Sequence, residues 1–245
     1  MAVSGIESEK GRSVVNFTLL ARDRFNLTKQ CLMSLKRSGC MRDLTVTIFD
    51  DASKKETKEL LETWCEDNFA HLVRKDESVG TGIARNSVIK ESETEYGRGE
   101  FLYLGDNDSC FFPGWLEILI KAYRVAWLDS YKVLGGVNHP FHQPVASLPI
   151  PGCCEVKQIE ALALQSMLMT WYVFDKYGPF CSTPVGRVCM GEDVEFAWRI
   201  AANKGKLGVV HPAVVVNTGI TNSFGEKIPG WELVRAQAPS GVLVE

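Results

Sequence analysis

Residues 101–108 read FLYLGDND, an apolar run that continues at once into two carboxylates on either side of Asn107. The run Phe101–Leu104 has the length and the residue types of a buried strand. Two carboxylates one residue apart at the end of a strand suit a hard divalent cation that also holds a diphosphate. The alternative is an ordinary Asp/Asn turn. At this position we favour a metal site at Asp106 and Asp108.

The chain before this stretch alternates strand-like and helix-like patterns. Strands are predicted at 14–20, 44–49 and 72–74, and helical patterns at 27–35, 53–64 and 80–93. Ser53 and Glu56 have the spacing of a capping box that would open the second helix. Such alternation indicates an α/β fold with parallel strands joined by right-handed crossovers. In sheets of this kind, ligands bind at the carboxyl ends of the strands.

The chain after this stretch is less regular. The patterns predict helices at 115–127 and 192–204 and strands at 133–137, 166–170, 207–210 and 213–216. Between them, Asn138–Cys154 is rich in proline and histidine and is expected to be a long loop. We find no internal repeat and no linker, which favours one domain with two lobes.

Composition excludes several classes of protein. The 245 residues include 30 acidic and 27 basic ones, a net charge of −3, and 45% are hydrophobic. This balance excludes a disordered chain, a collagen-like repeat and a strongly basic nucleic-acid binder. Four prolines interrupt the longest uncharged stretch, Val133–Cys154, so no membrane span is expected. Eight cysteines without C-x-x-C spacing, and no signal-peptide core, favour a cytoplasmic protein.

Polar residues follow two of the other predicted strands. Asp50 and Asp51 could accept hydrogen bonds from a nucleobase or a ribose, or could belong to a helix N-cap. The stretch Gly80–Asn86 resembles a dinucleotide fingerprint, but Arg85 stands where the third glycine is required. A Rossmann dehydrogenase is therefore disfavoured, and no P-loop is present. Arg85 could still contact a phosphate or order a carboxylate.

A further acidic cluster, Gly191–Glu195, opens the predicted helix 192–204. Acidic residues in a first turn complement the helix dipole, so the cluster could serve the helix alone. It could also supply a carboxylate base. The dipole would lower the pKa of that base and desolvation would raise it, and the sequence leaves the balance open.

Taken in order, these motifs resemble the inverting glycosyltransferases of family 2. The motifs are ARDR (21–24), DDAS (50–53), VGTGIARN (79–86), FLYLGDND (101–108), FPGWLE (112–117) and GEDVEFAWRI (191–200). The resemblance implies the GT-A fold of nucleotide-diphospho-sugar transferases, with a mostly parallel Rossmann-like sheet flanked by helices and a smaller acceptor-side lobe. It implies tails at 1–13 and 226–245 around a domain at 14–225, divided into a nucleotide-sugar half (14–110) and an acceptor half (111–225).

The resemblance also implies residue roles. Asp108 would be the direct ligand of Mn²⁺ or Mg²⁺, with Asp106 nearer the ribose, and the metal would neutralise the leaving diphosphate. Asp193 would deprotonate the acceptor hydroxyl, and Glu192 would position the acceptor. The remaining expected contacts to the nucleotide-diphosphate sugar, for which a UDP-sugar is favoured, come from Ala21, Arg22, Arg24, Asp50, Asp51, Gly80, Arg85 and Asn107.

The sequence departs from the family pattern at Asn217. Family members often place a metal-binding histidine there, and an amide oxygen is a weaker ligand for Mn²⁺ than an imidazole. Asn217 is retained here as a third expected metal ligand beside Asp106 and Asp108, with the possibility open that the metal is dispensable.

The interpretation that follows is a hexosyltransferase that acts on a hydroxyl with inversion. The acceptor stays open between a glycan, a lipid-linked glycan, a protein and a hydroxylated DNA base. A sugar nucleotidyltransferase is disfavoured because LLARDRFN after the first strand contains no glycine. A non-catalytic module that binds sugar nucleotides is the third alternative, because of Asn217.

Overall fold

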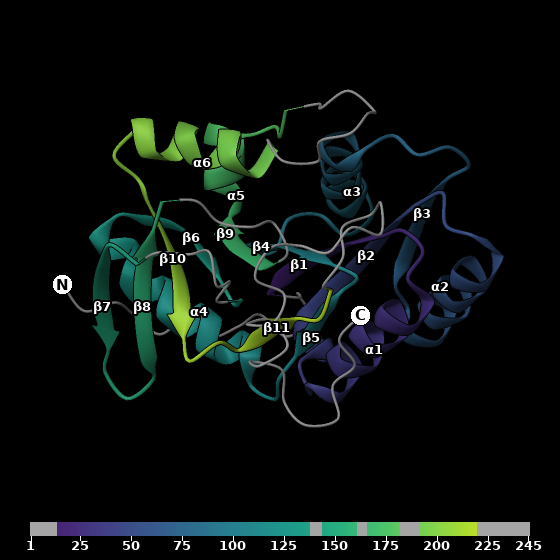
Figure 1. Ribbon diagram of the computed structural model, residues 1–245, viewed down its shortest axis with the longest axis horizontal. Coiled ribbons are helices and arrows are strands. Elements are labelled where there is room, and N and C mark those ends of the chain that lie inside the picture. Colours follow the sequence, from purple (N-terminus) through teal and green to yellow (C-terminus); the bar gives the residue numbers. More distant parts are fainter. Residues whose placement is uncertain (1–13, 138–143, 161–165, 182–191, 220–245) are drawn as a thin grey trace.

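The computed structural model describes residues 14–137, 144–160, 166–181 and 192–219. A nine-stranded sheet forms the centre, in the order β3-β2-β1-β4-β9-β6-β10-β8-β7, and helices cover both of its faces (Figure 1). A separate two-stranded sheet pairs β5 with β11. The strands are β1 (Val15–Ala21), β2 (Leu44–Asp51), β3 (His71–Lys75), β4 (Phe101–Asp106), β5 (Ser109–Phe111), β6 (Tyr131–Gly135), β7 (Ala146–Ile150), β8 (Cys154–Ile159), β9 (Ser166–Thr170), β10 (Lys206–His211) and β11 (Val215–Asn217).

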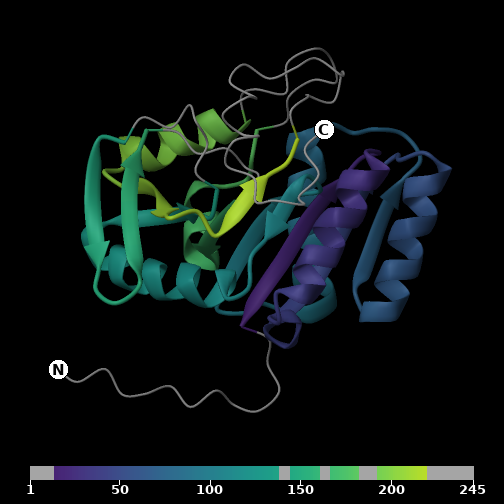
Figure 2. The same ribbon diagram turned by 60° about the horizontal axis from the view of Figure 1, so that its bottom comes forward.

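The helices form two layers, each with its own hydrophobic core. Buried side chains of α1, α2 and α4 pack on one face of the sheet, and those of α3, α5 and α6 pack on the other. Figure 2 shows α1, α2 and β1 beside one another in the first part of the chain. The helices are α1 (Phe25–Arg37), α2 (Lys55–Asn68), α3 (Thr81–Tyr96), α4 (Trp115–Ala126), α5 (Trp171–Tyr177) and α6 (Glu192–Ala202), with short 3₁₀ turns at Met41–Asp43 and Trp127–Asp129.

The predicted α/β fold with a flanked sheet is confirmed. Strands β3, β2, β1 and β4 are all parallel, as their alternation with helices requires. Beyond β4 the sheet is mixed, because β9 runs antiparallel to both of its neighbours. The domain limits at 14, 110 and 225 stay predictions, and both predicted tails lie outside the described residues.

Two local predictions are wrong. The predicted loop Asn138–Cys154 contains β7, and β7 forms a hairpin with β8. Strand β7 is an exposed edge strand with a proline at position 149, and such a strand lacks the apolar alternation on which strand prediction depends. Ser53 does not cap α2, which begins at Lys55 without a side-chain cap. The Oγ atom of Ser53 instead accepts a hydrogen bond from the backbone N–H of Asp23 at 2.8 Å.

The seven cysteines in the described ranges are unpaired, and four of them are buried. Among the described residues, the structure holds no helix with the length and apolar character needed to cross a membrane.

Aromatic rings form the centre of the core beneath β1 and β4. Phe17 stacks on Tyr103 with ring centroids 5.0 Å apart, and Trp115 of α4 packs 4.8 Å from Tyr103. All three side chains are fully buried. Because Phe17 and Tyr103 belong to adjacent strands, this contact fastens β4 to β1 in addition to their backbone hydrogen bonds.

Phe17→Ala is expected to lower the free energy of unfolding by about 3–5 kcal/mol, since it removes a fully buried ring and leaves a cavity. Urea denaturation measures the change. The control is Phe69→Ala, because Phe69 is 94% exposed, and its effect should stay within about 0.5 kcal/mol. Equal effects of the two variants would contradict the placement of Phe17.

Candidate active site

The carboxyl ends of β1, β2 and β4 meet at one edge of the sheet. Ala21 pairs with Asp50 across β1 and β2, and Leu20 pairs with Asp106 across β1 and β4. The segments that follow these strands therefore begin side by side, as Figure 1 shows. This is the edge at which parallel α/β sheets bind ligands.

Asp50 and Asp51 face opposite sides of β2 and have different roles. Asp50 is fully buried, and its carboxylate binds the Arg74 guanidinium and the backbone N–H of Ser53. Asp51 accepts hydrogen bonds from the Ser78 hydroxyl at 2.6 Å and from the backbone N–H of Val79 at 2.8 Å. Both carboxylates thus hold the loops of this edge in place. Contact of either one with a nucleotide stays a prediction.

The loop after β1 is conformationally strained. Asp23 and Arg24 both have left-handed backbone angles, with φ of 51° and 54°. Two successive non-glycine residues in this region cost about 1 kcal/mol or more each. The side chain of Asn107 stabilises the loop by donating to the carbonyl oxygen of Asp23 at 3.1 Å and to the hydroxyl of Thr28 at 2.6 Å. Asn107, expected to contact the sugar donor, here positions the loop that carries Arg24.

Arg22 extends from the same loop toward the loop after β3. Its guanidinium donates to the hydroxyl of Ser78 at 2.7 Å and lies 3.9 Å from the carboxylate of Asp51. Ser78 was not singled out in the sequence. The sequence feature that could have indicated Ser78 is its position, as a small polar residue just before the glycine-rich stretch that begins at Gly80 and leads into α3.

Arg85 is buried in α3, directly beneath the end of β4. Its Nη2 donates to Asp106 Oδ1 at 2.5 Å, and its Nε, also buried, has no hydrogen-bond partner. The side chain of Arg85 is 3% exposed, whereas that of Asp106 is 27% exposed. The pair therefore places one partly open carboxylate and one buried cation at the centre of the edge.

Asp108 is the most constrained carboxylate of the site. Its Oδ2 accepts a hydrogen bond from Arg24 Nη1 at 2.8 Å, while its Oδ1 is buried and has no hydrogen-bond partner among the described residues. The pKa of Asp108 is raised to about 6, mainly by burial and then by the nearby charge of Asp106, and Arg24 opposes both effects. A buried acceptor that lacks a partner costs about 1–3 kcal/mol, so this oxygen is suited to a ligand.

The last described strand brings a distant segment to Asp108. Thr218 binds the backbone carbonyl oxygen of Asp108 twice, through its N–H at 2.7 Å and its hydroxyl at 2.8 Å. Gly219 lies against the Asp108 carboxylate so closely that a Cβ at this position would collide with it and would lie 3.0 Å from Arg24 Nη1. Neither residue was predicted for the site. The sequence feature that could have indicated this close approach is the glycine itself, two positions after Asn217.

Asn217 pairs with Ser109 across β11 and β5, next to Asp108. Its side-chain oxygen accepts a hydrogen bond from the backbone N–H of Gly219 at 2.7 Å. Its Nδ2 is buried and has no hydrogen-bond partner among the residues that the structure describes. The atom that Asn217 leaves available is therefore a hydrogen-bond donor, which gives no support to the predicted role as a metal ligand.

Asp193 and Glu192 begin α6. The Oδ1 atom of Asp193 accepts a hydrogen bond from the backbone N–H of Val194 at 2.8 Å. Burial raises the pKa of Asp193, and Glu192 adds to this, whereas the Val194 hydrogen bond and the charge of Arg85 lower it. Desolvation therefore outweighs the stabilising contacts at the helix start. Glu192 is 4% exposed, and its Oε2 has no partner.

Arg85 interacts both with Asp106 at the end of β4 and with Asp193 at the start of α6. It forms an ion pair with Asp106 and also stabilises the charged form of Asp193. Asp51, Asp106, Asp108 and Asp193 are therefore not scattered over the surface. Asp51 ends β2 and Asp106 ends β4, the two strands on either side of β1, and Asp108 follows β4. Asp193 is within the electrostatic reach of Arg85.

The residues fit a divalent cation that has few protein ligands. Asp108 offers a buried, unpartnered carboxylate oxygen, and Asp106 offers a partly exposed carboxylate. Within the described ranges, no three side chains of His, Cys, Asp or Glu gather as a ligand set. A cation at this place would need phosphate or water oxygens to complete its coordination, as Mg²⁺ and Mn²⁺ commonly do.

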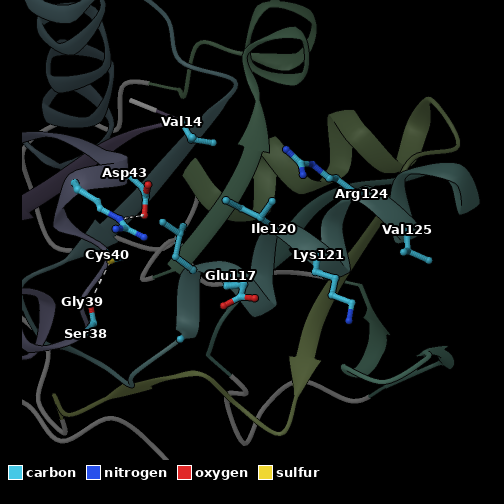
Figure 3. Close-up of a pocket in the computed structure, with 13 residues that line it drawn as sticks. Val14, Ser38, Gly39, Cys40, Asp43, Glu117, Ile120, Lys121, Arg124 and Val125 are labelled. Atoms are coloured by element: carbon cyan, nitrogen blue, oxygen red, sulfur yellow. Dashed lines mark hydrogen bonds and ion pairs between the residues drawn. The ribbon is translucent and has the colours of Figure 1, made fainter. Parts of the chain in front are cut away.

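A cavity of about 600 Å³ lies elsewhere, between α4 and the turn after α1 (Figure 3). Val14, just before the first residue of β1, lines it, whereas the acidic edge follows the last residue. Seven strand residues span about 20 Å, so the cavity and the acidic edge are at opposite ends of β1. We therefore place the site at the acidic edge on chemical grounds.

Comparisons with known proteins agree with this fold. Residues 20–133 match the model of glycosyl transferase family 2. No curated protein sequence matches the chain. Many solved structures share its fold, and three serve as examples. They are a mannosyltransferase, PcManGT, from Pyrobaculum calidifontis in complex with GDP-Man and Mn²⁺ (TM-score 0.60, 17% identity, 93% of this chain and 62% of that one); GalNAc-T7 with UDP, GalNAc and Mn²⁺ (0.60, 15%, 82% and 43%); and Staphylococcus aureus TarS (0.61, 16%, 91% and 38%).

The chain thus has the GT-A fold, which it shares with these solved structures. The match to the family 2 model covers residues 20–133, a little under half of the chain. The chain spans between about two fifths and three fifths of the length of these solved structures.

The raised pKa of Asp108 predicts a pH dependence of stability in metal-free protein. Its carboxyl binds a proton more tightly in the folded state, so the wild type should lose stability as the pH rises from about 4 to about 6. The difference between 3.8 and about 6 corresponds to about 3 kcal/mol. Asp108→Asn should lack this loss. Denaturant unfolding in EDTA at several pH values measures it, and parallel curves for both proteins would contradict the prediction.

Proposed function

We propose that this chain transfers a sugar from a nucleotide-diphosphate sugar to an acceptor hydroxyl. The observation that carries the proposal is Asp108, which places a buried, unpartnered carboxylate oxygen at the ligand-binding edge beside two arginines. The structural neighbours support it, since PcManGT was solved with GDP-Man and Mn²⁺ and TarS with UDP-GlcNAc. A UDP-hexose is the first donor to test.

The arginines and the loops of the edge would bind the nucleotide diphosphate. Arg22 and Arg24 follow β1, and Arg85 lies under Asp106, so three guanidinium groups surround the place where phosphates would lie. Guanidinium groups are well matched to phosphate oxygens. Asp106 and Asp108 would hold Mn²⁺ or Mg²⁺, which would neutralise charge on the departing diphosphate.

Asp193 is the proposed general base. The acceptor oxygen would form a bond to the anomeric carbon while the bond from that carbon to the phosphate oxygen breaks, and the hydroxyl proton would pass to Asp193. Its raised pKa makes this carboxylate a stronger base than an exposed aspartate. A single base on the face opposite the leaving group gives inversion. Glu192, buried next to Asp193, would position the acceptor.

The first experiment is a thermal-shift panel of UDP-, GDP-, CDP- and ADP-sugars with Mn²⁺ and with EDTA. One sugar nucleotide at 100 times its Kd should stabilise the chain by about 2.7 kcal/mol. The stabilisation should be larger with Mn²⁺, because Asp108 would gain a cation for its unpartnered oxygen. No stabilisation by any member of the panel would remove the proposed function.

Asp193→Asn should lower the release of nucleoside diphosphate from the sugar donor by about 10²–10⁴-fold, because the base is lost. Binding of the sugar donor should be retained. The control is Glu195→Gln on the same helix, since the Glu195 carboxylate pairs with Arg199. Turnover is measured with a panel of hydroxyl acceptors, and NMR of the product should show an inverted anomeric centre. A retained centre, or full turnover by Asp193→Asn, would contradict the assignment.

A further inference from the structure

Asn217 carries a polar group that the fold leaves without a partner. Asn217 is 2% exposed, and within the part of the chain that the structure describes its Nδ2 has no hydrogen-bond partner. Buried amide nitrogens are almost always hydrogen-bonded, because a lost hydrogen bond to water is otherwise not replaced. The unpartnered N–H groups lie in the two-stranded sheet that follows Asp108, within the candidate site and not in the hydrophobic core.

The backbone of Gly219 determines which end of the amide is available. Its N–H donates to Asn217 Oδ1 at 2.7 Å. Exchanging the two ends of the amide would place N–H groups against each other, which gives repulsion in place of a hydrogen bond. The oxygen is thus held by Gly219, and the nitrogen is the end that can take a ligand. A ligand for this nitrogen must supply an oxygen lone pair.

The surroundings restrict the chemistry of that ligand. Gly219 contacts both residues, since its N–H binds Asn217 Oδ1 and a Cβ on it would collide with the Asp108 carboxylate. Arg24 Nη1 donates to the same carboxylate at 2.8 Å. Asp108 Oδ1 requires a cation or a hydrogen-bond donor, whereas Asn217 Nδ2 requires an acceptor. A cation that carries a phosphate satisfies both requirements together. A phosphate oxygen also has enough lone pairs for an arginine and an amide at once.

We propose that Asn217 binds the terminal phosphate of the nucleotide diphosphate through Nδ2, as a hydrogen-bond donor and not as a metal ligand. The inference rests on the proposed function, which brings a diphosphate to this edge. Asn217 would then distinguish diphosphates from monophosphates. It would also stabilise the leaving diphosphate after the sugar has been transferred, since the terminal phosphate gains charge in that step.

The test compares UDP and GDP with UMP and GMP, which lack the terminal phosphate. Titration calorimetry in EDTA gives Kd for the wild type, Asn217→Asp and Asn217→Ala. Asn217→Asp keeps an oxygen for the N–H of Gly219, removes the hydrogen-bond donor and adds a negative charge. Asn217→Ala removes both without adding charge. Each variant should bind the preferred diphosphate about tenfold more weakly and the monophosphate with less than about a twofold change.

Asn203→Asp is the matched control, because it adds the same charge at an exposed position after α6. It should leave both affinities unchanged. Should an Asn217 variant fail to fold, the side-chain NH₂ resonance of Asn217 in ¹⁵N-labelled wild type provides a second measurement. That resonance should shift with the diphosphate and not with the monophosphate.

The outcomes separate this inference from the proposed function. The inference is overturned by equal affinity for diphosphate and monophosphate in the wild type, by unchanged diphosphate binding in both variants, or by tighter Mn²⁺-dependent binding in Asn217→Asp with no loss in EDTA. The last result would make Asn217 a metal-ligand position. The proposed function is overturned only if the wild type binds no nucleoside diphosphate and no sugar nucleotide, with or without Mn²⁺.

Discussion

The in-register parallel pairing of β1 with β2 and β4 is the constraint on which the site depends. It fixes where Ala21, Asp50 and Asp106 end their strands, and hence where the following loops begin. A slip of one residue would reverse every side chain of a strand. In β2 such a slip would exchange Asp50, which is fully buried against Arg74, with Asp51, which holds the loop before α3. The aromatic contact between Phe17 and Tyr103 opposes a slip from within the core.

Ion pairing explains how so many carboxylates can share one edge. A buried carboxylate without a partner would lose its charge or destabilise the fold. Here each acidic side chain that ends β2 or β4 has an arginine from another segment. The pairs are Asp50 with Arg74, Asp51 with Arg22, Asp106 with Arg85 and Asp108 with Arg24. An anionic ligand would be attracted to the same arginines. Its binding would therefore replace some of these ion pairs with contacts between the arginines and the ligand.

Local sequence was enough to predict β1, β2, β4 and the acidic residues after them. Their apolar runs are continuous, and polar residues begin where the strands end. Local sequence was insufficient where distant segments decide the structure. Ser53 has the pattern of a helix cap, but the N–H of Asp23, 30 residues earlier, binds its hydroxyl. The role expected for Asn217 depended on position alone, and only its bond to Gly219 shows which end of the amide is available.

Strand β11 completes the site from the far end of the sequence. Across 110 residues of sequence, Thr218 binds the backbone carbonyl oxygen of Asp108, and Gly219 lies against the Asp108 carboxylate. Without these two residues, Asp108 would lose both contacts. During translation the parallel half of the sheet emerges first, at about 5–20 residues per second, so roughly 10 s separate Asp108 from its last neighbours. A nascent chain can therefore form most of the parallel sheet before the contacts around Asp108 are complete. Those contacts form only after Thr218 and Gly219 have been synthesised.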